Sequence, residues 1–276
     1  MSTPPLFTAH NIKLVDGSQT LPSAAFSMEE DPRFISAKKV LDVVIPLPRP
    51  QKISLFEKAL GITQNAKKHS VLDLGCLEGG YSAEFARLGY ETLGIEVREI
   101  NYNCCQYVKE NLNLPNLRFV QDDVMNIANY GEFDAAFCCG LLYHLDRPKH
   151  FLTMLAKQIK KVIIIQTHFS LLENNLNSKY PLSPITVNEG LNGRWYKEFE
   201  EGATLLDKEA ARWSSYENNG SFWIQREFLI ELLYSLGFQT VFEQFDSLAP
   251  QISFELQNNY TNMMRGTFVG IKDNNT

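Results

Sequence analysis

The sequence predicts an α/β fold with a mainly parallel sheet, and three observations favour it. Residues 71–80 (VLDLGCLEGG) form a hydrophobic strand that runs into a glycine-rich turn, and residues 81–88 continue as a helix. A second hydrophobic strand, residues 91–96, ends in an acid about 20 residues after the turn. Strands and helices then alternate as far as residue 168. Together these features are typical of a nucleotide-binding βαβ unit.

Each further element follows from its local pattern. Apolar residues at helical spacing predict helices, short apolar runs predict strands, Pro148 opens a helix and Gly237 ends one. The predicted strands are residues 70–74, 91–96, 117–120, 133–140, 161–168, 240–245 and 266–271, and the predicted helices after the first are residues 100–112, 148–159 and 224–236.

The glycine-rich turn indicates a ligand that carries no phosphate. Its glycines are Gly75, Gly79 and Gly80, and Leu77 occupies the middle position of Gly-x-Gly-x-x-Gly, so the pyrophosphate fingerprint is not present. Asp73, two residues before the first glycine, suits a cationic amino group. The alternative is a turn of the same shape that binds no ligand.

These residues resemble motif I of the class I S-adenosylmethionine-dependent methyltransferases. The resemblance implies a Rossmann-like fold, with a seven-stranded mixed sheet and helices on both faces, and S-adenosylmethionine as the cofactor. Leu77 departs from the usual middle glycine of that family. The cofactor-binding residues predicted on this basis and from the spacing are Asp73, Gly75, Cys76, Leu77, Gly79, Glu96, Val97, Asp123, Val124 and Gly140.

Length and composition predict one large domain, or one domain with an inserted cap. The chain has 276 residues, of which 44% are hydrophobic, and no apolar run approaches the ~20 residues of a membrane span. No signal-peptide pattern opens the sequence, so we expect a cytoplasmic protein. The net charge of −6 argues against broad contact with nucleic acid, although a local basic patch is compatible with it.

The cysteines predict free thiols rather than a metal site. All five fall in predicted strands, helices or the turn, and their spacing is not that of metal ligands. Metal binding by the adjacent cysteine pairs, or by Asp122 and Asp123, is the alternative. We therefore predict no metal. The cysteines are Cys76, Cys104, Cys105, Cys138 and Cys139.

The chain divides into four predicted parts: an N-terminal arm with gating helices (1–62), a cofactor-binding core (63–169), an inserted substrate cap (170–222) and the end of the core sheet (223–276). Asp31 and Pro32 open the first gating helix, and the capping box from Ser54 to Glu57 opens a second. In the resembled family such helices gate the cofactor. The cap is predicted from about 50 irregular residues rich in Asn, Ser, Gly and aromatic side chains.

Two histidines are candidate catalytic bases. Tyr143 and His144 follow the fourth predicted strand, and His168 ends the fifth. Ligands of an open α/β sheet bind beyond the carboxyl ends of the strands, so these residues are expected at the mouth of the site. Methyl transfer from a sulfonium requires positioning of the acceptor and, for some acceptors, removal of a proton. A hydrogen-bonded structural histidine is the alternative for each.

Substrate contacts are predicted for five residues. Arg194 would hold an anionic substrate or form a surface salt bridge, and the tryptophans would form an aromatic wall or pack the cap against the core. The predicted substrate-binding residues are Tyr143, Arg194, Trp195, Trp213 and Trp223.

The acceptor class stays open between several hypotheses. One resemblance is to bacterial enzymes that modify the wobble uridine of tRNA by carboxymethyl transfer, and it rests on Gly140-Leu141-Leu142-Tyr143-His144 and Arg147-Pro148. Similar sequence features also occur in methyltransferases of secondary metabolite and glycan pathways. Because the charge is negative, we expect a small-molecule acceptor, a secondary metabolite or sugar-containing compound methylated on O or N. The alternatives are a tRNA-modifying enzyme, with a plain or carboxylated donor, and a non-catalytic cofactor-binding module.

Overall fold

The computed structural model describes residues 4–47, 68–173, 179–245 and 263–273, and all statements below concern these residues. A seven-stranded sheet with the order β3-β2-β1-β4-β5-β10-β9 forms the centre. Its first five strands are parallel, and β10 runs antiparallel between β5 and β9. The predicted seven-stranded mixed sheet is confirmed. Its strands are β1 Ser70–Leu74, β2 Glu91–Glu96, β3 Leu117–Gln121, β4 Phe133–Cys139, β5 Ile159–His168, β9 Thr240–Gln244 and β10 Arg265–Ile271.

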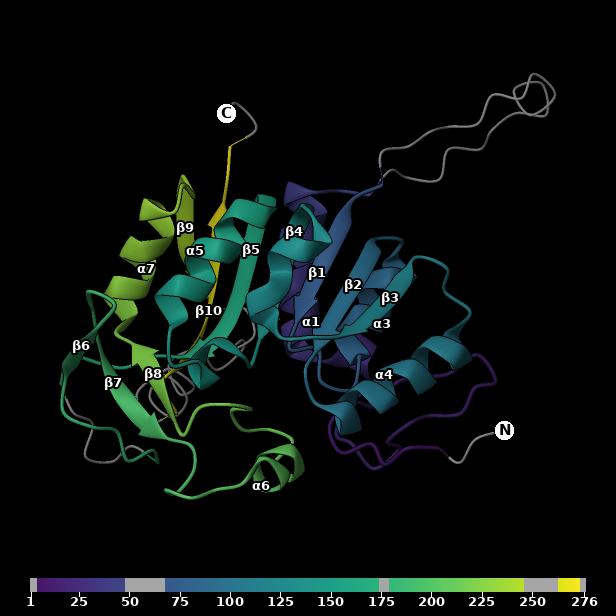
Figure 1. The fold of residues 1–276 in the computed structure, drawn as a ribbon. Coiled ribbons are helices and arrows are strands. Elements are labelled where there is room, and N and C mark those ends of the chain that lie inside the picture. The colour runs from purple at the N-terminus through teal and green to yellow at the C-terminus, as the bar shows by residue number, and fades with distance from the viewer. Residues whose placement is uncertain (1–3, 48–67, 174–178, 246–262, 274–276) are drawn as a thin grey trace.

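Helices cover both faces of the sheet and enclose one hydrophobic core on each face (Figure 1). Neighbouring residues of one strand alternate between the two cores: Leu72 belongs to one and Val71 to the other. This is the period of two expected for a sheet buried on both faces. The helices are α1 Pro32–Val44, α3 Gly80–Leu88, α4 Glu99–Leu112, α5 Pro148–Gln158 and α7 Arg226–Ser235, with the 3-10 turns η1 Met28–Glu30, η2 Val124–Tyr130 and η3 Leu142–His144.

The first gating helix begins and ends as its sequence predicts. The Asp31 carboxylate accepts a hydrogen bond from the Arg33 backbone N–H, Pro32 occupies the first helical position, and α1 ends two residues before Pro46. The predicted second gating helix, with its capping box from Ser54 to Glu57, lies outside the described residues.

The predicted cap is more regular than its composition suggests. It contains the antiparallel strands β6 Thr186–Asn188, β7 Leu191–Lys197 and β8 Gly220–Ile224, together with α6 Leu205–Ala210. Residues 198–219, between β7 and β8, are called the cover segment below. In Figure 1 the small sheet and α6 lie at the lower edge of the view, where β5 ends.

The structure changes two predicted boundaries, the end of the cap and the start of the last helix. Strand β8 crosses the predicted end of the cap at residue 222 and includes Ile224, which we expected to open the last helix. Ile224 instead pairs with Gly193, and its carbonyl accepts a hydrogen bond from Ser170. None of the described helices is both long and apolar enough to cross a membrane.

Gly79 provides a test of the packing beneath the turn. Its φ is +80°, and an added Cβ would lie 2.7 Å from Cζ of Phe119. Gly237 has a similar φ of +90° but no atom within 4 Å of the added Cβ. We expect Gly237→Ala to lower the free energy of unfolding by about 1 kcal/mol through backbone strain, and Gly79→Ala to lower it by about 1–3 kcal/mol more through the additional clash. Urea denaturation measures both, and equal losses would contradict the packing argument.

Candidate active site

A cavity of about 650 Å³ lies at the carboxyl ends of the parallel strands, where the sheet predicts a ligand. Four parts of the chain form its wall: the N-terminal arm, the core, the cover segment, and β10 through Arg265. Seven of the ten predicted cofactor-binding residues line it, together with three of the predicted catalytic or substrate-binding residues. These ten are Gly75, Leu77, Glu96, Val97, Asp123, Val124, Gly140, Tyr143, His144 and Trp213.

The remaining predicted cofactor residues lie behind this wall. The Asp73 carboxylate accepts a hydrogen bond from Ser82 Oγ at 2.6 Å, and Cys76 Sγ lies 3.8 Å from Cys105 Sγ. Gly79 makes room for the Phe119 ring rather than for a ligand. Asp73 lies in β1 and Cys76 and Gly79 lie in the turn, and none of the three lines the cavity.

Leu77 adopts the backbone conformation of the glycine that it replaces. Its φ is +53°, in the left-handed region that non-glycine residues rarely occupy, which costs about 1 kcal/mol or more. The Leu77 N–H donates to Glu96 Oε2 at 3.0 Å, and Cys105 Sγ donates to the Leu77 carbonyl at 3.1 Å. The departure from the motif therefore changes a side chain and leaves the path of the turn intact.

Glu96 ends β2 at the cavity wall as the spacing predicts. Its second oxygen, Oε1, accepts from the Arg98 N–H at 2.9 Å, so both oxygens are oriented by backbone donors. Burial raises the pKa of Glu96, and the hydrogen bonds from Arg98 and Leu77 oppose this shift. A carboxylate fixed in this way at the end of β2 fits the hydroxyls of a ribose.

The third acid of the predicted set, Asp123, follows β3 and lines the cavity. Its Oδ1 accepts from the Met125 N–H at 2.8 Å and caps η2. The adjacent Asp122 points elsewhere, because its carboxylate accepts from Asn126 and Tyr130. This supports the choice of Asp123 over Asp122. No group of three or more potential ligands in the described part of the chain could hold a metal ion.

Glu78, which the sequence did not single out, connects the turn to the arm and the cover segment. Its side chain is 0% exposed. Its carboxylate accepts from the backbone N–H groups of Thr8, Ala9 and His10 at 2.6 to 3.0 Å, and it pairs with Arg212 at 3.2 Å. Four charge-assisted contacts on one buried carboxylate hold both covering segments at the cavity.

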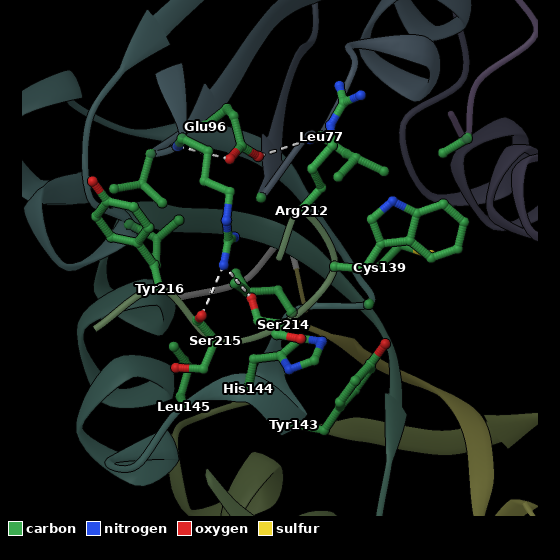
Figure 2. Close-up of a pocket in the computed structure, with 18 of the residues that line it drawn as sticks. Leu77, Glu96, Cys139, Tyr143, His144, Leu145, Arg212, Ser214, Ser215 and Tyr216 are labelled. Atoms are coloured by element: carbon green, nitrogen blue, oxygen red, sulfur yellow. Dashed lines mark hydrogen bonds between the residues drawn. The ribbon is translucent and has the colours of Figure 1, made fainter. Parts of the chain in front are cut away.

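Arg98 provides a second connection to the cover segment. Its guanidinium donates to the carbonyls of Ser214 at 2.6 Å, Ser215 at 2.7 Å and Lys208 at 3.2 Å. Figure 2 shows Ser214 and Ser215 between Glu96 and Leu77 at one end of the view and Tyr143 and His144 at the other. The cover segment therefore spans both ends of the cavity.

His144 is paired with a carboxylate that sequence reasoning missed. Its Nδ1 lies 2.7 Å from Oε1 of Glu198, whose side chain is 2% exposed. Burial alone would raise the pKa of Glu198, but hydrogen bonds from His144 and Ser221 lower it below its usual value. An ionised carboxylate at Nδ1 assigns the hydrogen to that nitrogen and leaves Nε2 as an acceptor. No local signal marks Glu198, because it lies 54 positions after its partner in sequence.

His168 occupies a different environment from His144. It is 5% exposed and does not line the cavity. Its Nδ1 donates to the Met263 carbonyl at 2.7 Å, and its ring stacks on Trp223 at 4.7 Å. Burial lowers its pKa to about 3. This arrangement fits the structural alternative for His168 and not the predicted role as a base.

Three predicted substrate-binding residues also lie in the interior rather than at the cavity. Arg194 is neither an anion site nor a surface salt bridge: it is 5% exposed and donates to the carbonyls of Leu171, Leu172 and Ser183. Trp195 packs on Phe222. Trp223 is 1% exposed and donates from its indole to the Tyr143 carbonyl. These side chains hold the cap in place, because a large aromatic or guanidinium group serves packing as readily as recognition.

Comparison with known proteins agrees with this geometry. Residues 71–162 match the family model described as a methyltransferase domain. The match supports the predicted enzyme class and S-adenosylmethionine as its cofactor. No curated protein matches the sequence.

Solved structures share the fold. The N-terminal domain of EvdMO1 with SAH bound has a TM-score of 0.55 and 20% identity over 90% of this chain and 100% of that chain. The same domain in the presence of SAH and D-fucose has a TM-score of 0.55 and 21% identity, with the same coverage of 90% and 100%. A protein from Listeria monocytogenes assigned as an S-adenosylmethionine-dependent methyltransferase has a TM-score of 0.53 and 17% identity, over 79% and 96%.

The residues at the cavity fit this cofactor. Glu96 and Asp123 present two carboxylates beyond the ends of the neighbouring strands β2 and β3, on the side of the sheet where the ribose and adenine would bind. Asp73 lies behind the turn with its negative charge unpaired by any described cation, and burial raises its pKa to about 7. A cationic ligand at the turn would favour its ionised form.

Glu78 should hold the arm on the core. Glu78→Gln replaces an acceptor-only carboxylate by an amide, so it removes the charge facing Arg212 and one of the two acceptor oxygens. We expect the amide hydrogens of Thr8, Ala9 and His10 to exchange at least about ten times faster. The matched control is Glu84→Gln, a buried carboxylate of α3 that pairs with Arg87 instead. Unchanged exchange in Glu78→Gln would contradict the anchoring role.

Asp73 predicts a pH-dependent contribution to stability. Its pKa is raised to about 7 in the fold, against about 3.9 in an unfolded chain. Its stabilising contribution is therefore complete below about pH 4 and is lost as the pH rises through about 7. Relative to the native protein, Asp73→Asn should gain about 2 kcal/mol in free energy of unfolding between about pH 5 and pH 8, measured by urea denaturation. The exposed control Asp207→Asn should show no such gain, and a pH-independent difference for Asp73→Asn would contradict the assignment.

Proposed function

We propose that this protein transfers a methyl group from S-adenosylmethionine to an oxygen or nitrogen atom of a small molecule, with His144 as the general base. The observation that carries the proposal is that one cavity joins the cofactor turn to the His144–Glu198 pair. When bound, S-adenosylmethionine supplies a methyl group activated by the positive charge on its sulfur. Gly75, Leu77, Glu96 and Asp123 would hold its methionyl and adenosyl parts.

His144 would remove the proton from the acceptor as the acceptor oxygen or nitrogen attacks. Its Nε2 accepts this proton, and Glu198 stabilises the imidazolium through Nδ1–H. Ser221 and Ser215 donate to Glu198 at 2.8 and 3.3 Å and so orient the carboxylate. Tyr143, the neighbour of His144 at the cavity wall, would position the acceptor.

The enclosure of the cavity favours a small acceptor over tRNA. The arm and the cover segment both contribute to its wall, so a bound acceptor is surrounded on several sides. The negative net charge of −6 points the same way. One of the solved structures of similar fold was determined in the presence of D-fucose, which agrees with a sugar-containing acceptor. Methylation of a secondary metabolite by a cytoplasmic enzyme remains our hypothesis, and the oligomeric state is left open.

S-adenosylmethionine with a labelled methyl group tests the acceptor class. The protein is incubated with a host extract separated into small metabolites and bulk tRNA. Label in the metabolite fraction supports the proposal and gives a mass for identification. Label in tRNA would support the wobble-uridine hypothesis instead. Absence of S-adenosylhomocysteine binding would contradict the methyltransferase function itself.

Replacement of the base separates catalysis from cofactor binding. We expect His144→Gln to lower kcat by about 10²–10⁴-fold while S-adenosylhomocysteine binds with unchanged affinity, because the base acts only on the acceptor. Glu198→Gln should lower kcat in the same direction by loss of ring orientation. The exposed His150→Gln is the matched control and should keep full activity. Full activity of His144→Gln would show that another group, or none, removes the proton.

A further inference from the structure

One wall of the cavity carries an arginine that pairs with no acid in the part of the chain that the structure describes. Arg265 begins β10 and lines the cavity. Its Nη2 donates to Gln166 Oε1 at 2.8 Å, whereas its Nε is buried and has no acceptor. Within the described ranges, no carboxylate forms an ion pair with its guanidinium. The side chain therefore uses few of its donors on the protein itself.

Two acids of this region, Asp31 and Glu243, are paired with other cations. Asp31 accepts from Arg33 Nε at 2.9 Å and Nη2 at 2.5 Å. Glu243, on the neighbouring strand β9, pairs with Arg226 at 2.7 Å. The charge of Arg33 at the cavity wall is therefore balanced by Asp31, whereas no described carboxylate pairs with Arg265.

This charge lies beside the proposed catalytic base. The Arg265 guanidinium carbon is 5.8 Å from the centre of the Tyr143 ring, and that ring is 4.2 Å from the His144 ring. All three side chains line the same cavity. A single small molecule can therefore contact Arg265 with one group while it presents a second group to His144.

The positive charge of Arg265 also acts on the pKa of two neighbouring side chains. Burial raises the pKa of the Cys139 thiol in this wall, and Arg33 and Arg265 oppose that shift. For Tyr143 burial likewise raises the pKa, and Arg265 opposes the rise. Arg265 thus offsets part of the cost of placing a negative charge at this end of the cavity.

We propose that Arg265 binds an anionic group of the methyl acceptor, a carboxylate or a phosphate, and so makes the enzyme specific for small acidic molecules that carry a hydroxyl or amine. The proposal rests on the proposed function, since it concerns the acceptor of that reaction. The planar guanidinium matches both anions, and the donors that have no acceptor among the described residues can bind either anion in a bidentate manner.

Matched pairs of charged and neutral probes test this specificity. With the protein saturated with S-adenosylhomocysteine, calorimetry compares 3-hydroxybenzoate with 3-hydroxybenzamide, and phenyl phosphate with phenol. We expect the anion of at least one pair to bind at least about ten-fold tighter than its neutral twin. The pair with the larger preference identifies the group as carboxylate or phosphate. Equal binding of the charged and neutral members of both pairs would overturn the proposal.

Two variants assign the preference to Arg265. Arg265→Gln should abolish the preference for the anionic probe and leave S-adenosylhomocysteine binding unchanged. Arg265→Lys keeps the positive charge but loses the paired donors of the guanidinium, so it should retain a reduced preference. Arg147→Gln is the matched control, because Arg147 also lines the cavity but is 61% exposed and lies 3.7 Å from Glu189; it should keep the preference. A preference that survives in Arg265→Gln would overturn the proposal, whereas failure of the native protein to bind S-adenosylhomocysteine would overturn the proposed function instead.

Discussion

A carboxylate with no exposure to solvent must be satisfied by the protein, and at Glu78 this constraint organises the site. Desolvation of a charged group is costly unless donors replace the lost water. Glu78 obtains these donors from the N-terminal arm and from Arg212 of the cover segment. Because Glu78 lies in the turn between β1 and α3, its requirement brings both segments to the carboxyl edge of the sheet, where they become walls of the cavity.

The core could be predicted from sequence because its information is local. Each strand of the central sheet is a short apolar run, and Gly75 and the acids at 96 and 123 stand at fixed distances from such runs. Even Leu77 adopts the expected backbone path, because Glu96 and Cys105 bind its backbone N–H and carbonyl and hold that path against the strain of a non-glycine residue. Spacing along the chain therefore identified, among the ten predicted cofactor residues, seven that line the cavity.

The acceptor side could not be predicted, because its contacts join distant parts of the chain. The proposed role of Glu198 depends on its contact with His144, and that of Arg265 depends on its position beside Tyr143. Conversely, Arg194 and Trp223 have the residue types of a binding site but are used for packing. His144 and His168 both follow strands, and only the burial and partners of each ring separate them.

The docking of His10 on α3 has a consequence for the architecture of the chain. The His10 Nδ1 accepts the N–H of Gly80 at 2.9 Å, and burial lowers the pKa of His10 to about 4, so the ring is neutral. A side chain at position 80 would meet this ring at 2.8 Å. The domain match covers residues 71–162 alone, yet excising that stretch would leave Glu78 without its donors and Gly80 without its acceptor. The arm is thus an integral part of the folding unit, and the minimal functional module begins well before the first strand of the sheet.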